Sequence, residues 1–350
     1  MRKTLLSMLV LQLSFLAADA TPRYSVLYNQ SCVLCHVDPA GGAARSLYGA
    51  QFFAYTDLAM QRLPMDELSG VQPMLNDQVQ IGFDARSMFF GTDKPATNTF
   101  MQMQGDLYLI FQLSPQWTFF LSKGLYAGFE VYGMGHFLPW NGYLKAGRFR
   151  PPLGMYPADH KAFVRERLGV DFNWAETGVE IGFHPQRFTF EIAATNGNTA
   201  FQDNNEAKAI TARADVRFPV GPVNFWLGAT GRYNEVTGET DQIVGGYGGL
   251  AFRRFILTGE VDYRDFQKQQ LASFLEAAYV LQRGLTIKVE HDFHDPDVDI
   301  ESGSENMYGI GAEIVPTGFL QLIPNVRFHD IQPVDEADYY EAEIQFHLFF

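Results

Sequence analysis

Two cysteines and the histidine that follows them form the motif with the most specific chemistry in this chain of 350 residues. They lie in the run Cys32-Val33-Leu34-Cys35-His36, and the sequence contains no other cysteine. In a C-x-x-C-H motif the two thiols bind a porphyrin covalently and the imidazole ligates its iron. A C-x-x-C redox pair beside an incidental histidine is the alternative interpretation. We therefore predict one haem c, attached to Cys32 and Cys35, with His36 as the proximal ligand of the haem iron.

The first 20 residues have the pattern of a secretory signal peptide. Arg2 and Lys3 supply positive charge, an apolar stretch runs from Leu5 to Leu16, and Ala18-Asp19-Ala20 fits a cleavage site. The apolar stretch is too short to span a bilayer as a helix. Export of the chain from the cytoplasm agrees with the C-x-x-C-H motif, because haem c is attached to cysteine thiols outside the cytoplasm.

The composition excludes one class of partner and favours one class of fold. The formal net charge is −14 at pH 7, which argues against a nucleic-acid partner because phosphates require a basic surface. Aromatic residues make up 15% of the chain, and 32 residues are glycine. Together with the acidic balance, these values suit an outer-membrane β-barrel, although a soluble protein is also compatible with them.

Residues 21–75 are predicted to form a small α-helical segment of the c-type cytochrome class. Residues 43–62 carry apolar side chains at three- and four-residue spacing, which predicts one amphipathic helix that ends at Leu63-Pro64. A segment of this length buries little apolar core by itself. We therefore expect the rest of the chain to cover the exposed edges of the haem.

The second axial ligand of the haem iron has several candidates. Met60 and Met65 follow the motif at distances that a short cytochrome uses, and so does Met74. The alternative for each is an ordinary methionine that fills a gap in a core. Histidines of the later chain reach the iron only if the haem lies inside that part of the protein; they are His136, His160, His184, His294, His329 and His347.

Residues 76–350 show an apolar pattern with a period of two residues. The last stretch is the clearest example, since the side chains from Tyr340 to Phe350 alternate between apolar and polar. The same pattern recurs in sixteen segments, each long enough for a tilted strand to cross a membrane. These segments are 77–90, 99–113, 116–124, 127–137, 142–150, 175–184, 187–196, 207–219, 223–235, 242–253, 255–267, 271–282, 285–295, 305–315, 318–330 and 338–350. We predict an all-β fold, a 16-stranded antiparallel outer-membrane barrel, with a soluble domain of two packed sheets as the alternative.

The predicted connections alternate between short turns and long polar loops. The long ones are 91–98, 151–174, 197–206, 236–241, 296–304 and 331–337. In bacterial outer-membrane barrels the short turns face the periplasm. An even number of strands then places both ends of the barrel, and the haem segment, on the periplasmic side.

Loop 151–174 differs from the other long loops because it carries a basic cluster that includes Lys161, Arg165 and Arg167. The run from Gly147 to Pro152 before it resembles the corresponding region of anion-selective porins. Two interpretations remain open. The loop either folds inward and constricts the pore, or it is a solvated surface loop.

The whole mature chain resembles the monohaem cytochrome–porin fusions of bacterial outer membranes, whose best-known members oxidise Fe(II). The resemblance is carried by Cys32-Val33-Leu34-Cys35-His36 and by the following Pro39-x-Gly41-Gly42-x-x-Arg45-x-x-Tyr48-Gly49. It implies that Cys32 and Cys35 hold the haem and that His36 is its proximal ligand. It also implies that the haem segment lies within the barrel or at its periplasmic mouth.

These features predict an electron conduit through the outer membrane. A single haem would pass electrons between an extracellular donor, such as Fe(II), and a periplasmic carrier, such as a soluble cytochrome. Enzyme activity as an oxidoreductase is left open. The alternative function is a diffusion channel for small solutes, with the haem segment as a plug or redox gate. A third hypothesis, a haem enzyme, needs an open axial site and a polar distal pocket, which no segment indicates.

Overall fold

We describe the fold from a computed structural model, which covers residues 22–125, 129–157, 159–171, 174–203, 205–333 and 337–350. The predicted signal peptide, residues 1–20, lies outside the described residues. The helical elements are α2 (Pro22–Tyr28), η1 (Cys32–Leu34), η2 (Tyr48–Leu58), η3 (Leu68–Gly70) and α3 (Phe163–Glu166). In the described part of the chain, no helix combines the length and the hydropathy that a membrane span requires.

Strands make up most of the chain. Their bounds are β1 (Met74–Asn76), β2 (Val79–Asp93), β3 (Ala96–Ser114), β4 (Trp117–Gly124), β5 (Phe129–Leu138), β6 (Gly142–Phe149), β7 (Glu176–Phe183), β8 (Phe188–Thr195), β9 (Ala209–Val220), β10 (Val223–Val236), β11 (Glu239–Phe252), β12 (Phe255–Phe266), β13 (Lys268–Gln282), β14 (Leu285–Asp295), β15 (Glu305–Thr317), β16 (Leu320–Ile331) and β17 (Tyr339–Phe349). All sixteen predicted strands are present, as β2 to β17, and β1 is a short addition.

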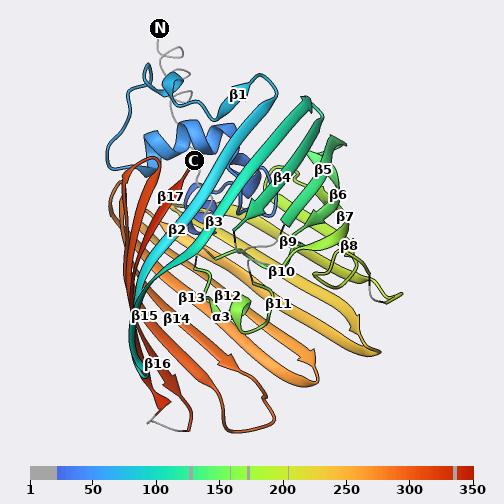
Figure 1. Cartoon of the computed structure of the whole chain (residues 1–350), viewed down its shortest axis with the longest axis vertical. Coiled ribbons are helices and arrows are strands. Elements are labelled where there is room, and N and C mark those ends of the chain that lie inside the picture. The colour runs from blue at the N-terminus through green and yellow to red at the C-terminus, as the bar shows by residue number, and fades with distance from the viewer. Residues whose placement is uncertain (1–21, 126–128, 158, 172–173, 204, 334–336) are drawn as a thin grey trace.

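The strands β2 to β17 form a closed antiparallel barrel (Figure 1). Each strand pairs with the next one in sequence, and β17 returns to pair with β2. At the end of the β17–β2 pairing, Phe350 and Phe83 exchange two backbone hydrogen bonds. The N–H of Phe350 donates to the carbonyl of Phe83 at 3.0 Å, and the N–H of Phe83 donates to the carbonyl of Phe350 at 3.1 Å. The prediction of a 16-stranded antiparallel barrel is therefore confirmed.

The two faces of the wall follow the predicted alternation. In β17, Ile344 and Phe346 point outward and are exposed, whereas Glu343 and Gln345 point inward and are buried. An exposed apolar face and an inner face rich in charge are what a membrane barrel requires, because lipid contacts only the outside. The same alternation holds in β9, where Arg213 and its neighbours on that face are buried in the lumen.

Two predicted long loops are tight hairpins, so these predictions are wrong. The connection expected over 91–98 is reduced to two residues between β2 and β3, and that over 236–241 to Thr237 and Gly238. Both Thr237 and Gly238 have positive φ, as the favoured two-residue hairpin turns require. Beyond the membrane both faces of a strand are polar, so the apolar alternation ends before the strand does.

The N-terminal segment, residues 22–71, lies against the inside of the barrel at the end that carries the short turns. The α2 helix contacts β10, β11 and β12. Farther along, Met60 N–H donates to the carbonyl of Val315 at 2.8 Å, and the Arg283 side chain donates to the carbonyl of Ala59 at 2.7 Å. The barrel wall therefore covers this segment, as its small size led us to expect.

The N-terminal segment contains only short helical elements, so the fold does not show the predicted α-helical cytochrome segment. The single helix predicted over 43–62 is helical only at Tyr48–Leu58. Residues before Tyr48 are instead paired with the end of the C-x-x-C-H run and the residue after it: His36 forms an antiparallel bridge with Arg45, and the N–H of Val37 donates to the carbonyl of Ala44 at 3.1 Å. Apolar spacing alone did not reveal this competing pairing.

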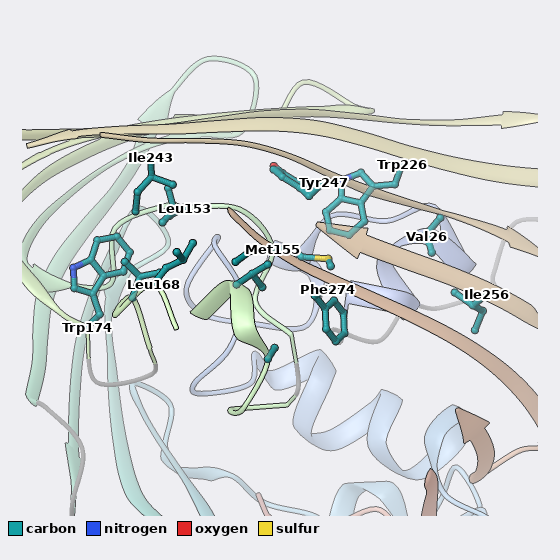
Figure 2. Close-up of a cluster of buried hydrophobic side chains, with 14 of the residues drawn as sticks. Val26, Leu153, Met155, Leu168, Trp174, Trp226, Ile243, Tyr247, Ile256 and Phe274 are labelled. Carbon is teal, nitrogen blue, oxygen red and sulfur yellow. The ribbon is translucent and has the colours of Figure 1, made fainter. Parts of the chain in front are cut away.

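The described residues of loop 151–174 fold into the barrel, which decides between its two interpretations. Leu153, Met155 and Leu168 of the loop are buried. They belong to one hydrophobic cluster that also includes Val26 of the N-terminal segment and side chains of the wall (Figure 2); the wall residues labelled there are Trp226, Ile243, Tyr247, Ile256 and Phe274. The lumen is therefore narrowed by the N-terminal segment and by this inward loop.

Candidate functional site

The C-x-x-C-H run folds as a single helical turn. Its 3₁₀ element η1 begins at Cys32, and the N–H groups of Cys35 and His36 both donate to the carbonyl of Cys32, at 3.1 and 3.0 Å. Residues three and four positions apart lie on the same side of a helical turn. The thiols of Cys32 and Cys35 and the imidazole of His36 therefore project from one short, fixed piece of backbone.

A second stretch of the N-terminal segment holds that turn in place. The N–H of Ser46 donates to the carbonyl of Cys35 at 2.8 Å, and the Ser46 hydroxyl donates to the carbonyl of Leu34 at 2.7 Å. Gly49 lies directly against the Cys35 carbonyl, where a Cβ atom would overlap the oxygen. The glycine is therefore needed for the close approach of the two backbones.

We expect Gly49→Ala to destabilise the N-terminal segment by about 1–3 kcal/mol, because the added methyl group overpacks the contact with Cys35. Gly70→Ala is the matched control, since a Cβ at Gly70 meets nothing within 4 Å. Limited proteolysis of the folded barrel measures the difference as faster cleavage within residues 22–71. Equal cleavage rates for the two variants would show that the contact is unimportant.

Buried ion pairs tie the N-terminal segment to the wall. Asp38 accepts from Lys145 of β6 at 3.3 Å, and Lys145 also contacts Glu180 of β7 at 2.9 Å. Arg23 pairs with Glu276 at 3.1 Å and with Glu313. Because all of these side chains are buried, removing one partner leaves an uncompensated charge in a dry environment.

We expect Lys145→Met to weaken the folded state by about 3–5 kcal/mol, because Asp38 and Glu180 then lose their shared cation. Lys208→Met is the control, since its pair with Asp203 is exposed and such pairs contribute about 0–1 kcal/mol. Denaturant unfolding in detergent measures both variants. An effect of Lys145→Met no larger than that of Lys208→Met contradicts the role of this ion pair.

A cavity lies between the N-terminal segment, the inward loop and the wall, with about 1450 Å³ of empty space, part of it open to solvent. His36 lines it from the N-terminal segment, His160 from the inward loop and His347 from β17. Charged side chains of both signs complete its lining; they include Arg45, Arg86, Arg150, Asp84, Asp106 and Glu130. No spacing or periodicity indicated that His160 and His347 share a cavity with His36.

The inward loop is fixed by charge pairs on both sides of His160. Asp159 pairs with Arg327 of β16, and Lys161 pairs with Glu341 of β17 at 2.6 Å. Farther along the loop, Arg165 pairs with Glu260 of β12 at 2.8 Å. The basic cluster that singled out this loop in the sequence thus contacts carboxylates of the lumen wall.

The predicted methionine ligands lie elsewhere. Met60 is at the rim of the barrel, with its N–H on the carbonyl of Val315, and 68% of Met65 is exposed. Neither methionine lines the cavity of His36. Their role as distal ligands stays a prediction.

Burial changes the pKa of two groups, the thiol of Cys32 in η1 and the imidazole of His160 in the inward loop. It raises the pKa of the Cys32 thiol, which the nearby Arg213 and Arg217 only partly offset. It lowers the pKa of His160 well below its ordinary value, and the positive charge of Arg86 lowers it further. Near pH 7 the first group is therefore a protonated thiol and the second a neutral imidazole.

The residues of the C-x-x-C-H turn fit a haem c. The donor set is two thiols and one imidazole on a single turn, and in the described structure no disulfide joins the thiols. Gly41 has φ +92° and lies against the Cys32 sulfur, where a Cβ atom would come within 3.4 Å. A glycine here leaves the thiol uncrowded. Among the residues that the structure describes, no cluster of three or more His, Cys, Asp or Glu side chains is arranged to bind a metal ion directly.

No family model and no curated protein matches the chain, but many solved structures share its fold. OprB of Pseudomonas putida at high pH has a TM-score of 0.64 and 11% identity, over 85% of this chain and 100% of that one. The anion-selective porin from Comamonas acidovorans has a TM-score of 0.55 and 13% identity, over 78% and 99%. OmpT of Vibrio cholerae has a TM-score of 0.57 and 10% identity, over 79% and 99%. The barrel is thus porin-like and fits a bacterial outer membrane.

These neighbours overturn the predicted main function. The structures that resemble this chain are porins, and this finding favours the alternative of a diffusion channel over an electron conduit. The extracellular donor and the periplasmic carrier that a conduit requires have no support in the comparisons. In the lumen, the inward loop and charged side chains surround a cavity that is partly open to solvent. The resemblance to cytochrome–porin fusions is not tested by these structures and stays a prediction.

Proposed function

We propose that the protein is a porin-type diffusion channel for small polar solutes, with residues 22–71 as a haem-bearing plug. The observation that carries this proposal is the cavity of about 1450 Å³ bounded by the N-terminal segment, the inward loop and the wall. Barrels of 16–18 strands leave an aqueous channel unless other parts of the chain fill it. Here two internal segments occupy part of the lumen and define what can pass.

The charges of the cavity favour hydrated solutes. Arg45, Arg86 and Arg150 lie on the same lining as Asp84 and Asp106. Side chains of both signs replace part of the hydration shell of a polar molecule, whereas an apolar solute gains nothing from them. We therefore assign the channel to small, water-soluble compounds rather than to lipids.

The plug is the part of the chain that would hold the haem. Cys32 and Cys35 would form the two thioether bonds, and His36 would ligate the iron from one side. When bound, the haem supplies a one-electron redox centre whose potential depends on its axial ligands and its burial. The chain's own contribution is the rigid turn of η1, which Ser46 and Gly49 hold against the neighbouring backbone.

Liposome swelling and planar-bilayer recording test the channel. Vesicles that contain the purified full chain should swell in small sugars and not in long oligosaccharides, and the bilayer should show a low, persistent conductance. Arg23→Ala removes the cation shared by Glu276 and Glu313, so it should loosen the plug and raise the conductance. Silent bilayers and unswollen vesicles for both the natural chain and Arg23→Ala would overturn the proposal.

A further inference from the structure

We propose that Gln104 and Asp106, on the inner face of β3, bind the ammonium group of a small zwitterionic solute that also carries a carboxylate. This inference rests on the proposed channel function and deepens it, because it names the class of solute that the cavity would hold. Three observations support it. They are two buried acceptor oxygens without a donor, a carboxylate without a cation, and positive charge beside both.

Gln104 and Asp106 belong to the lumen face of β3. They lie two positions apart in the strand, so their side chains point to the same side. Both line the cavity, and only 9% of Gln104 and 8% of Asp106 are exposed. The amide nitrogen of Gln104 donates to Oδ2 of Asp106 at 2.6 Å, which fixes the two side chains against each other.

The other side-chain oxygens of this pair accept no hydrogen bond from the residues that the structure describes. They are Oε1 of Gln104 and Oδ1 of Asp106. A buried acceptor without a donor costs free energy, and a bound group that donates to it removes that cost. An ammonium carries three N–H donors and no acceptor. Because the two side chains are held together, one ammonium is suited to donate to both oxygens.

The carboxylate of Asp106 also lacks a charge partner. Its hydrogen-bond partners are neutral, namely Gln104 and the hydroxyl of Tyr108, which lies 3.4 Å from Oδ2. Within the described part of the chain it forms no ion pair. Other carboxylates of the cavity are paired with arginines; they are Glu130 with Arg150, Asp159 with Arg327 and Glu313 with Arg23. A buried carboxylate without a cation favours a positively charged ligand group.

Two arginines of the same cavity define the rest of the ligand. Arg86 of β2 is the cross-strand partner of Gln104, and such partners have their Cβ atoms about 4.5–5.5 Å apart. Arg45 of the plug lies over the ring of Phe349, 3.9 Å from its centroid. These guanidinium groups repel a ligand that carries only an ammonium, whereas they attract a carboxylate on the same ligand. The favoured solute is therefore a zwitterion rather than a simple amine.

Other ligand classes fit this site less well. Ca²⁺ and Mg²⁺ take about six or more oxygen ligands. Among the described residues, no three or more His, Cys, Asp or Glu side chains are grouped so as to hold a metal ion. An uncharged polyol supplies hydrogen-bond donors but leaves the charge of Asp106 uncompensated.

Isothermal titration calorimetry of the purified full-length protein in detergent tests the site with probes of similar size. The zwitterion is L-alanine, the cation ethylamine, the anion propionate and the uncharged solute propanediol. We expect L-alanine to bind at least about tenfold more tightly than the other probes, because both of its charged ends form charge-assisted hydrogen bonds.

Two variants assign the binding to the pair on β3. Asp106→Asn keeps the shape of the side chain and removes its charge, so it should weaken L-alanine binding at least about tenfold. Gln104→Leu removes the second acceptor oxygen and should weaken binding as well. Glu239→Gln is the matched control, since Glu239 is exposed at the start of β11 and does not line the cavity. Heat-modifiable migration in electrophoresis verifies that each variant forms a folded barrel.

Binding of ethylamine or propanediol as tight as that of L-alanine overturns the assignment to a zwitterion. L-alanine binding that is absent from the natural protein, or unchanged in both Asp106→Asn and Gln104→Leu, overturns the site. Bilayer conductance tests the channel separately. A protein that conducts without binding L-alanine overturns the site alone, whereas one that binds L-alanine without conducting overturns the proposed function and leaves the site.

Discussion

Replacing both Cys32 and Cys35 by alanine is expected to remove all covalently bound haem from the protein. The chain has no other cysteine, so no other thioether can form. The measurement is a haem-specific peroxidase stain after denaturing electrophoresis, together with the mass of the intact chain. The natural protein should carry the mass of one haem, and the double variant should carry none.

Val33→Ala is the control for that experiment, because Val33 lies between the two cysteines and is partly exposed. It preserves both thiols and the backbone hydrogen bonds of the turn, so its haem content should equal that of the natural chain. A natural protein without covalent haem would show that the C-x-x-C-H run has another role. Haem retained by the double variant would show attachment at a different residue.

The second large effect is expected from removing the plug. Deletion of residues 22–62 should raise the single-channel conductance more than about twofold, since it removes one of the two internal segments that fill part of a lumen wide enough for an aqueous channel. The deletion leaves β1 and every strand of the barrel wall in the chain. Planar-bilayer recording of the refolded barrel gives the result directly.

Point variants test the same expectation in case the deletion variant does not refold. Arg23→Ala and Lys145→Met each remove one anchor of the plug and retain all strands. They should show intermediate conductance, with more frequent open events than the natural chain. Gln269→Ala, on β13 outside the plug contacts described above, is the matched control and should leave the conductance unchanged. If all plug variants match the natural chain, the N-terminal segment does not restrict the pore.

The barrel was predictable because one physical requirement repeats along the chain. Each strand contacts lipid on one face and the lumen on the other. Its side chains therefore alternate between apolar and polar, and this alternation is detectable in each of the sixteen predicted strands. β14 was predicted at 285–295 and is observed at Leu285–Asp295. β3 is longer than predicted because its first residues, such as Thr97 and Asn98, lie beyond the membrane and are polar on both faces.

The arrangement inside the barrel was less predictable. The inward fold of loop 151–174 depends on pairs such as Asp159 with Arg327, whose partners are far apart in sequence. The C-x-x-C-H turn was recognisable as a candidate haem site because its three possible donors lie within five residues. The cavity that His36 shares with His160 was not predictable. A single histidine in a loop belongs to no periodic pattern, so the sequence does not indicate toward which part of the protein its side chain points. Spacing favoured Met60 and Met65, which the fold places at the rim.

The pairing of β17 with β2 has a consequence for biogenesis. The wall becomes continuous only when its last strand joins its first, whereas the segment inside the wall precedes both in the chain. That segment is tied to strands on different sides of the barrel, through Arg23 and Asp38. The N-terminal segment is therefore enclosed by the barrel wall once β17 has paired with β2. Cys32 and Cys35 lie in that enclosed segment, so a modifying enzyme would reach their thiols more readily before β17 pairs with β2 than afterwards.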